Sequence, residues 1–188
     1  HTFRPMNMDF LHFLMDFYGG SMQIEQMRLF HDFSNLCDLS ITSGGFVRTD
    51  ASWHQDPLPS PISRLYYVMD GSGMLLSDDE QMPLEPGFVY LAPCGMACGF
   101  YGTASVTKLF FHINLILPDG YDLFASCRHF ARIPRAKEYM QRLLSWYAGE
   151  DAAGYAMLKG EIWNTVSAFA ERLLPPQTRR VSYSDPVA

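Results

Sequence analysis

The chain has 188 residues, of which 48% are hydrophobic and 18% charged, and its formal net charge is −6. This length and composition are typical of a globular chain with one sizeable core and exclude a disordered one. Only 14 Lys and Arg stand against 20 Asp and Glu, which excludes nucleic-acid binding by this chain itself, and the apolar segment 10–15 is too short to span a membrane.

Residues 1–37 are predicted to form a helical arm in two pieces. Pro5 is suited to open the first helix, and the Gly19-Gly20 pair breaks it. Ser21 can cap the second helix. The apolar positions of this second helix, Ile24, Met27 and Phe30, fall near helical spacing.

Short strands are predicted next. Apolar and polar residues alternate over 38–43, Gly44-Gly45 bends the chain before Phe46, and a polar, proline-rich loop follows over 50–61. Five apolar runs come after it, at 65–69, 74–76, 88–92, 97–101 and 106–117. Turn signals separate them, at 70–73, 77–80, 85–87, 93–95 and 102–103. Short strands at a spacing of about 8 to 12 residues predict an all-β sandwich or barrel.

The period changes again after about Tyr121. Apolar residues recur at steps of three and four over 135–149 and 152–174, which predicts two helices, and Pro175-Pro176 ends the second. Ser184-Asp185-Pro186 is typical of a further helix start. The predicted organisation is an arm (1–37), a barrel (38–120), a helical hairpin (121–175) and a linker (176–188).

Four motifs in residues 64–115 carry a family resemblance. They are Leu65–Gly73, Leu84-Glu85-Pro86-Gly87, Leu91–Gly95 and Leu109–Ile113. This order of strands and Gly-Pro corners resembles the conserved core of the cupin superfamily, and most of all the N-terminal domain of AraC-type transcription regulators. The resemblance implies a mainly β fold, a cupin-type β-barrel (double-stranded β-helix) with an N-terminal helical arm and a C-terminal α-helical hairpin. The glycines and prolines themselves argue for the fold and not for a function.

Metal-binding cupins resemble this core but carry ligands that are missing here. Counting from the first motif, their usual ligand positions fall on Leu58, Ser60, Arg64 and Cys98. Leu58 cannot ligate, Ser60 is a poor ligand and Arg64 repels a cation, so we expect no metal, no cofactor and no catalytic residue. The count crosses a loop, so a displaced His54 stays an alternative ligand.

A barrel without an ion can enclose a small ligand. Alternation over 108–115 puts Phe110, His112 and Asn114 on one face, which suits a pocket wall. An inward Arg64 would need a carboxylate partner or an anionic or polyhydroxylated ligand, and Trp53 could stack on a sugar. The predicted ligand-binding residues are Arg64, Tyr66, His112, Trp53, Tyr90 and Cys98. The structural alternatives are a core His112, a solvated Arg64, a Trp53 that closes the core, and ordinary core positions for Tyr90 and Cys98.

The last helix has apolar residues on more than one face, which is typical of a helix with two partners. In AraC-type proteins the hairpin after the cupin barrel commonly forms the homodimer contact. The resemblance therefore implies a dimer interface at Leu158, Ile162, Trp163, Val166 and Phe169. The alternative is one intramolecular contact with Trp163 half exposed.

By resemblance, the chain is the effector-sensing and dimerisation domain of a bacterial AraC-type transcriptional regulator and not an enzyme. Four irregularly spaced cysteines favour a cytoplasmic protein. The implied partners are a small-molecule effector, with a sugar as the first choice, a second copy of the chain, DNA only through a helix-turn-helix domain beyond residue 188, and RNA polymerase as a further partner of the full protein. Two alternatives stay open: a small cupin isomerase, lyase or oxygenase, which a bound transition metal would favour, and a barrel that only dimerises, which a packed interior would favour.

Overall fold

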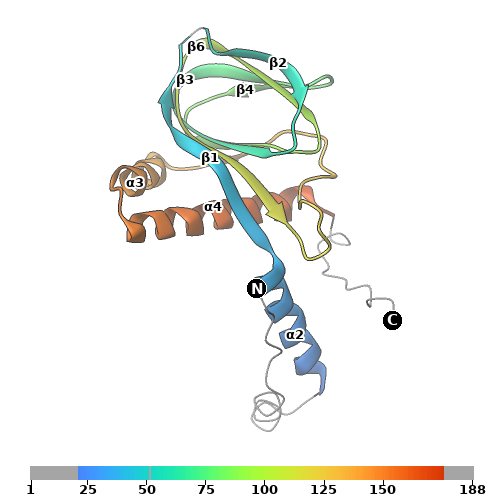
Figure 1. The fold of residues 1–188 in the computed structure, drawn as a ribbon. Coiled ribbons are helices and arrows are strands. Elements are labelled where there is room, and N and C mark those ends of the chain that lie inside the picture. The colour runs from blue at the N-terminus through green and yellow to red at the C-terminus, as the bar shows by residue number, and fades with distance from the viewer. Residues whose placement is uncertain (1–20, 51, 176–188) are drawn as a thin grey trace.

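A barrel of antiparallel strands lies above a hairpin of two helices, and a third helix points away from both (Figure 1). The computed structural model describes residues 21–50 and 52–175. The strands are β1 (Asp38–Arg48), β2 (His54–Pro59), β3 (Ser63–Leu76), β4 (Gln81–Leu84), β5 (Phe88–Ala92), β6 (Ala97–Ile116) and β7 (Ala131–Pro134). The helices are α2 (Ser21–Leu36), α3 (Lys137–Ala148) and α4 (Ala152–Leu173).

The two longest strands, β3 and β6, form the frame of the barrel. They pair antiparallel from Ser63 opposite Ile113 to Leu76 opposite Gly99. The sheet runs in the order β1-β6-β3-β5-β7, with β2 also paired to β6 and β4 to β3. This architecture, with its C-terminal helices, confirms the predicted mainly β, cupin-type fold.

Two of the predicted turns are bends inside long strands. The glycines of both, Gly73 and Gly102, pair with one another, so β3 and β6 each continue through the position where a turn was expected. The register slips on either side of Gly71. Gly71 has φ +86°, and a Cβ there would lie 1.7 Å from the carbonyl oxygen of Ser105. Glycine is therefore needed here to bend a paired strand, and not to close a hairpin.

Other boundaries differ from the sequence-based prediction as well. The proline-rich loop predicted over 50–61 contains β2. The bend expected at Gly44-Gly45 does not interrupt β1, whose register shifts earlier, between Ile41 and Ser43. β7 extends the sheet beyond the predicted barrel boundary at residue 120. The two C-terminal helices and the second arm helix are confirmed as α3, α4 and α2. The first arm helix and the linker 176–188 lie outside the described residues.

The central strands are apolar on both faces because each face covers a different core. On β6, Leu109 and Phe111 face the core shared with α3 and α4, whereas Phe110 faces the barrel interior. On β3, Tyr67 faces the core shared with α3 and α4, and Tyr66 faces the barrel interior. Alternation along a strand thus separates the layer under the hairpin from the inside of the barrel.

The corner at residues 93–95 is held by the loop that leads to β7. A Cβ on Gly95 would lie 2.4 Å from the carbonyl oxygen of Ala125, so only glycine allows this approach. Arg128 Nη1 donates hydrogen bonds of 2.9 Å to the carbonyl oxygens of Ala125 and Cys127, and these bonds fix the loop.

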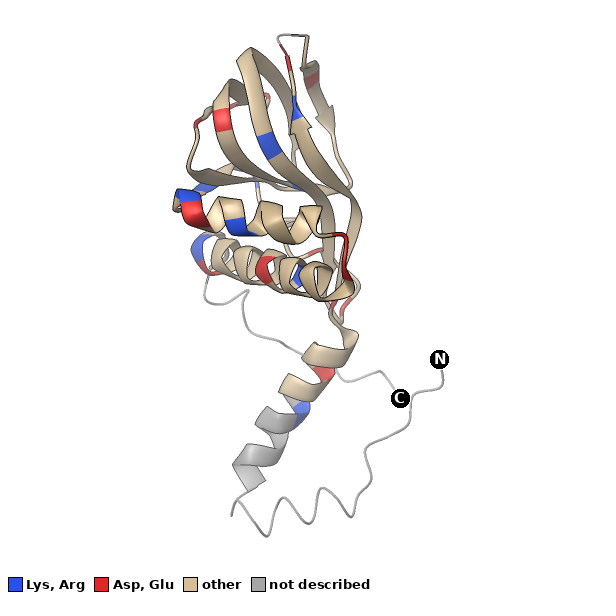
Figure 2. Cartoon of the chain, turned by 90° about the vertical axis from the view of Figure 1, so that its left-hand side faces the viewer, with Lys and Arg blue, Asp and Glu red and all other residues tan. Residues whose placement is uncertain are grey.

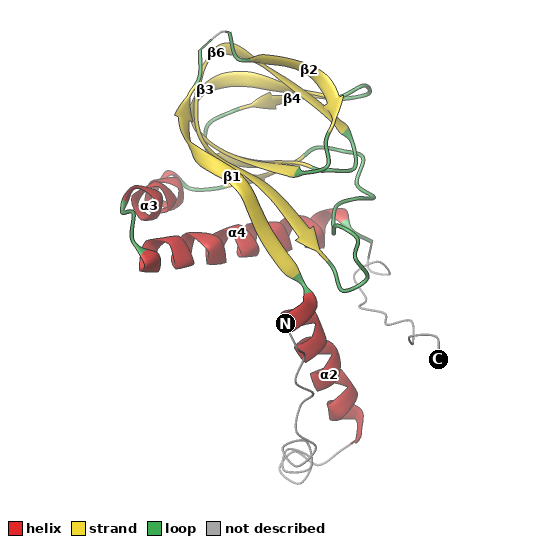
Figure 3. Cartoon of the chain, in the orientation of Figure 1, coloured by secondary structure: helices red, strands yellow, loops and turns green. Residues whose placement is uncertain are grey.

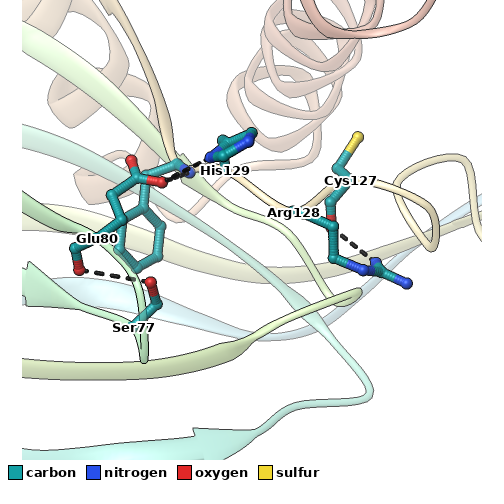
Figure 4. Close-up of polar contacts among 6 residues, drawn as sticks. Ser77, Glu80, Cys127, Arg128 and His129 are labelled. Carbon is teal, nitrogen blue, oxygen red and sulfur yellow. Dashed lines mark hydrogen bonds and ion pairs between the residues drawn. The ribbon is translucent and has the colours of Figure 1, made fainter.

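The same segment is tied to the turn before β4 (Figure 4). A carboxylate oxygen of Glu80 lies 3.1 Å from His129 Nδ1 and accepts a bond of 3.3 Å from the backbone N–H of Phe130. Ser77 donates to the carbonyl oxygen of Glu80. Glu80 thus links the β3–β4 turn to the start of β7.

Candidate functional site

The barrel contains a cavity of about 290 Å³. The residues around it come from β1, β2, β3 and β6 and from the loop before β2 (strands yellow in Figure 3). They are Val47, Thr49, Trp53, Gln55, Arg64, Tyr66, Phe100, Lys108, Phe110 and His112. The cavity is therefore a site of small-ligand size whose wall combines four aromatic rings, of Trp53, Tyr66, Phe100 and Phe110, with five polar or charged side chains.

The register of β3 against β6 explains why the polar groups meet. Arg64 lies opposite His112, and Tyr66 lies opposite Phe110. Lys108 is two residues from Phe110 along β6, on the same face. One wall of the cavity therefore consists of alternate residues on two neighbouring strands.

Four of the six predicted ligand-binding residues line the cavity: Arg64, Tyr66, His112 and Trp53. The other two do not. Tyr90 is fully buried, and its hydroxyl accepts a hydrogen bond of 2.7 Å from the backbone N–H of Glu85. Cys98 is fully buried too, and its thiol lies 3.7 Å from the carbonyl oxygen of Gly99. Both occupy ordinary core positions beside the cavity.

Lys108 is the main residue that the sequence-based prediction missed. It is only 3% exposed, and its Nζ lies 3.4 Å from the centroid of the Trp53 ring and 3.7 Å from that of Tyr66. Burial lowers the pKa of Lys108 from 10.5 to about 7; Cys98 opposes this shift, and Arg64 adds to it by repulsion. The signal was present in the alternation, because Lys108 shares a face with Phe110 and His112.

Arg64 and His112 complete the polar part of the wall. Nη1 of Arg64 is buried and has no hydrogen-bond partner among the described residues. His112 Nδ1 lies 3.0 Å from the hydroxyl oxygen of Ser43 on β1. Burial lowers the pKa of His112, and the positive charges of Arg64 and Lys108 lower it further, which favours the neutral imidazole.

Leu58 and Ser60, two of the positions that match ligand positions of metal-binding cupins, supply no metal ligand. Leu58 is 56% exposed, and the hydroxyl of Ser60 donates to the carbonyl oxygen of Ile62 at 2.8 Å. His54 lies 3.3 Å from the carboxylate of Asp56 on the same strand. Within residues 21–50 and 52–175, no three His, Cys, Asp or Glu side chains are grouped so that they could hold an ion.

Most of the predicted dimer residues are occupied by their own chain. Leu158, Ile162, Val166 and Phe169 are at most 5% exposed and belong to the core under the barrel. Trp163 is half-buried against the same core. Charged residues of both signs lie along α3 and α4 (Figure 2). The dimer stays a prediction. Because those four side chains are buried within their own chain, they are not exposed for contact with a second copy.

Comparison with known proteins gives structural likeness and no sequence relative. No protein-family model matches the chain, and no curated protein sequence matches it. The solved structures that match include apo ToxT K231A from Vibrio cholerae, with 8% identity and a TM-score of 0.45 over 73% of this chain and 57% of that one. YhaK from Escherichia coli matches with 10% identity and a TM-score of 0.40 over 52% and 43%. YlbA from E. coli, of family DUF861, matches with 18% identity and a TM-score of 0.37 over 53% and 44%.

The chain thus spans about half the length of these proteins. Among the described residues, no helix combines the length and the hydropathy that a bilayer crossing requires.

Proposed function

We propose that this chain is a sensor domain, which binds a small molecule in its cupin barrel and regulates transcription as part of an AraC-type protein of the bacterial cytoplasm. In this proposal the domain binds its ligand and does not transform it. DNA is contacted by a separate domain that follows the linker, and a second copy of the chain is the partner in a homodimer.

The observation that carries the proposal is the cavity. A barrel that served only for dimerisation would fill its interior with side chains, whereas this one leaves about 290 Å³ beside a buried lysine and an unpartnered arginine nitrogen. Two features support the proposed role in transcription regulation: the helical hairpin after the barrel, and the resemblance of the motifs in 64–115 to those of AraC-type regulators.

Signalling would work as a population shift. A ligand in the barrel would favour one placement of the arm, of the hairpin or of the second copy, and the linker after Pro175 would pass that placement to the DNA-binding domain. The size of the switch is limited by the difference between the ligand's affinities for the two placements.

A thermal-shift screen with sugars and small organic acids tests binding in the cavity. A compound at about 100 times its Kd stabilises a protein by about 2.7 kcal/mol, which raises Tm by about 5 to 10 °C for a chain of this size. We expect this rise to disappear in Trp53→Ala and Arg64→Ala. It should persist in Tyr155→Ala, a change at an exposed position on α4. A rise that both cavity variants retain would refute the cavity as the sensor site.

Light scattering tests the dimer. Because four predicted interface residues are buried in their own chain, Trp163→Glu and Met157→Glu are the informative changes; Met157 is 54% exposed. A dimer at micromolar concentration that either change dissociates supports the proposal, and a wild-type monomer at that concentration removes the dimer from it.

A further inference from the structure

Apart from the Tyr66 phenol, which burial keeps neutral, the ionisable groups around the cavity are basic. The lining contains one arginine, one lysine and one histidine, and no aspartate or glutamate. The chain as a whole is acidic, with a net charge of −6. The cavity therefore concentrates positive charge inside a protein whose overall charge is negative.

Neither cation has an acidic partner in the described part of the chain. The ion pairs there involve other residues, such as Arg132 with Glu85, and none includes Arg64 or Lys108. The Nη1 atom of Arg64 is buried with no hydrogen bond, and Lys108 is 3% exposed. Buried cations are normally paired, because desolvation disfavours a charge that no counter-charge offsets.

The neighbours of Lys108 compensate for only part of its charge. Its Nζ lies over the rings of Trp53 and Tyr66, at 3.4 Å and 3.7 Å from their centroids. Such cation–π contacts favour the ammonium but replace neither its hydration shell nor a carboxylate. The amine therefore keeps an unmet preference for an anion on its cavity side.

We propose that the ligand of this cavity is an organic anion, whose acidic group is held by Arg64 and Lys108 and whose apolar or aromatic body lies against Phe100 and Phe110. This proposal rests on the sensor function proposed above and narrows it to one class of ligand. A neutral sugar would leave both cations without a counter-charge. The rings that line the cavity suit a flat apolar body.

Binding of an anion has a second consequence, which a neutral ligand lacks. A negative group beside Lys108 favours the ammonium, so it raises the pKa of that amine again. The groups that face Lys108 are Trp53, Tyr66, Arg64, Phe100, Cys98 and His112, and none supplies a carboxylate. At pH 8 the bound anion should therefore draw one proton from the buffer onto Lys108.

The test compares two probes that differ in charge and hardly in shape: 2-naphthoate and 2-naphthamide. Isothermal titration calorimetry on the whole chain should show 2-naphthoate binding at least ten times more tightly than 2-naphthamide. Lys108→Met and Arg64→Gln should each remove most of that tenfold preference and leave binding of the amide unchanged. Lys159→Met, a change at an exposed position on α4, is the matched control and should keep the preference.

Titrations of 2-naphthoate at pH 8 in two buffers of different ionisation enthalpy measure the proton. We expect uptake of close to one proton in the wild type and in Lys159→Met, and none in Lys108→Met. A parallel titration with 2-naphthyl phosphate separates the two acidic groups: the tighter of the two binders identifies carboxylate or phosphate as the group that the cavity prefers. Circular dichroism of each variant checks that it is folded.

The outcomes separate the two proposals. If 2-naphthamide or a neutral sugar such as arabinose binds as tightly as 2-naphthoate, the anion proposal is overturned and the sensor cavity stands. The same holds if Lys108→Met and Arg64→Gln, shown to be folded, both bind 2-naphthoate like the wild type. If neither naphthalene probe binds and the screen of sugars and acids finds no compound that depends on Trp53, the sensor function itself is overturned.

Discussion

Replacing Lys108 by methionine should stabilise the protein and change how its stability depends on pH. The lysine is 3% exposed, and burial lowers its pKa from 10.5 to about 7. At 1.36 kcal/mol for each pKa unit, the charged form costs about 5 kcal/mol in the folded state. Methionine has a similar length and no charge, but it loses the cation–π contacts, worth about 1 to 2 kcal/mol. We therefore expect Lys108→Met to raise the free energy of unfolding by about 3 kcal/mol below pH 7.

The sign of the pH dependence follows from which state holds the proton. Between about pH 7 and pH 10.5 the unfolded chain keeps Lys108 protonated and the folded chain does not, so unfolding takes up a proton and stability rises with pH. From pH 7 to pH 8.5 this rise amounts to about 2 kcal/mol in the wild type. Lys108→Met lacks this contribution, so the two stability curves should converge as the pH increases.

Urea denaturation followed by circular dichroism at half-unit steps from pH 6.5 to pH 8.5 measures both quantities. Burial raises the pKa of the Cys98 thiol and of the Tyr66 hydroxyl, and both stay neutral in the folded state over this window. Taking the difference between variant and wild type cancels the titrating groups that do not interact with Lys108. Lys159→Met should follow the wild-type curve. Parallel curves for wild type and Lys108→Met, or a variant that is less stable at pH 6.5, would refute the reasoning.

Three further changes test how the frame is held together, each by urea denaturation. Asp122→Ala should lower the free energy of unfolding by about 1 to 3 kcal/mol, because the Asp122 carboxylate accepts hydrogen bonds of 2.9 Å from the backbone N–H groups of Leu115 and Phe124. An unchanged free energy of unfolding would mean that water replaces the carboxylate as the acceptor. Gly71→Ala should lower the free energy of unfolding by at least about 2 kcal/mol, because the added Cβ would collide with the carbonyl oxygen of Ser105. Gly120→Ala is the control, because Gly120 also has a positive φ but has open space around it. Phe169→Ala should cost about 3 to 5 kcal/mol, because this fully buried ring packs in the core between α4 and the barrel; a loss under 1 kcal/mol would show that the hairpin is not part of one cooperative unit.

The sequence predicted which segments are strands better than where they end. Alternation and turn residues indicated all the long strands, but the glycines at 71, 73 and 102 were interpreted as turns. In the structure those glycines sit inside β3 and β6, where they let two paired strands bend together. Whether a glycine ends a strand or bends it depends on its partner across the sheet, and that partner lies about 30 residues away.

Three short strands, β2, β4 and β7, were missed for a different reason. β2 contains Pro57 and Pro59, which argue against a strand, yet it pairs with β6 alone and the register slips between Gln55 and Leu58. β7 has four residues, too few to show a period. Pairing with a long neighbour creates such strands, and their own residues carry little signal.

For the site, period-two alternation placed His112 on one predicted wall and Arg64 with Tyr66 on another, and the register of β3 against β6 brings all three side chains to one cavity. It would have added Lys108 as well, but a lysine in a strand normally faces water, and composition alone gives no reason to place it inside. Only the three-dimensional enclosure by Trp53 and Tyr66 shows that this amine is buried.

The same alternation connects the cavity to the hairpin. Lys108, Phe110 and His112 line the cavity, whereas Leu109, Phe111 and Ile113 between them pack in the core shared with α3 and α4. Protein cores are close-packed, so a displacement of β6 on the cavity side has to be accommodated in the core on its other face, where Phe111 packs among residues of α3 and α4 and against Tyr67 of β3, with ring centroids 5.9 Å apart. An occupant that binds more tightly to one position of β6 would therefore bias the hairpin directly, through the two faces of a single strand.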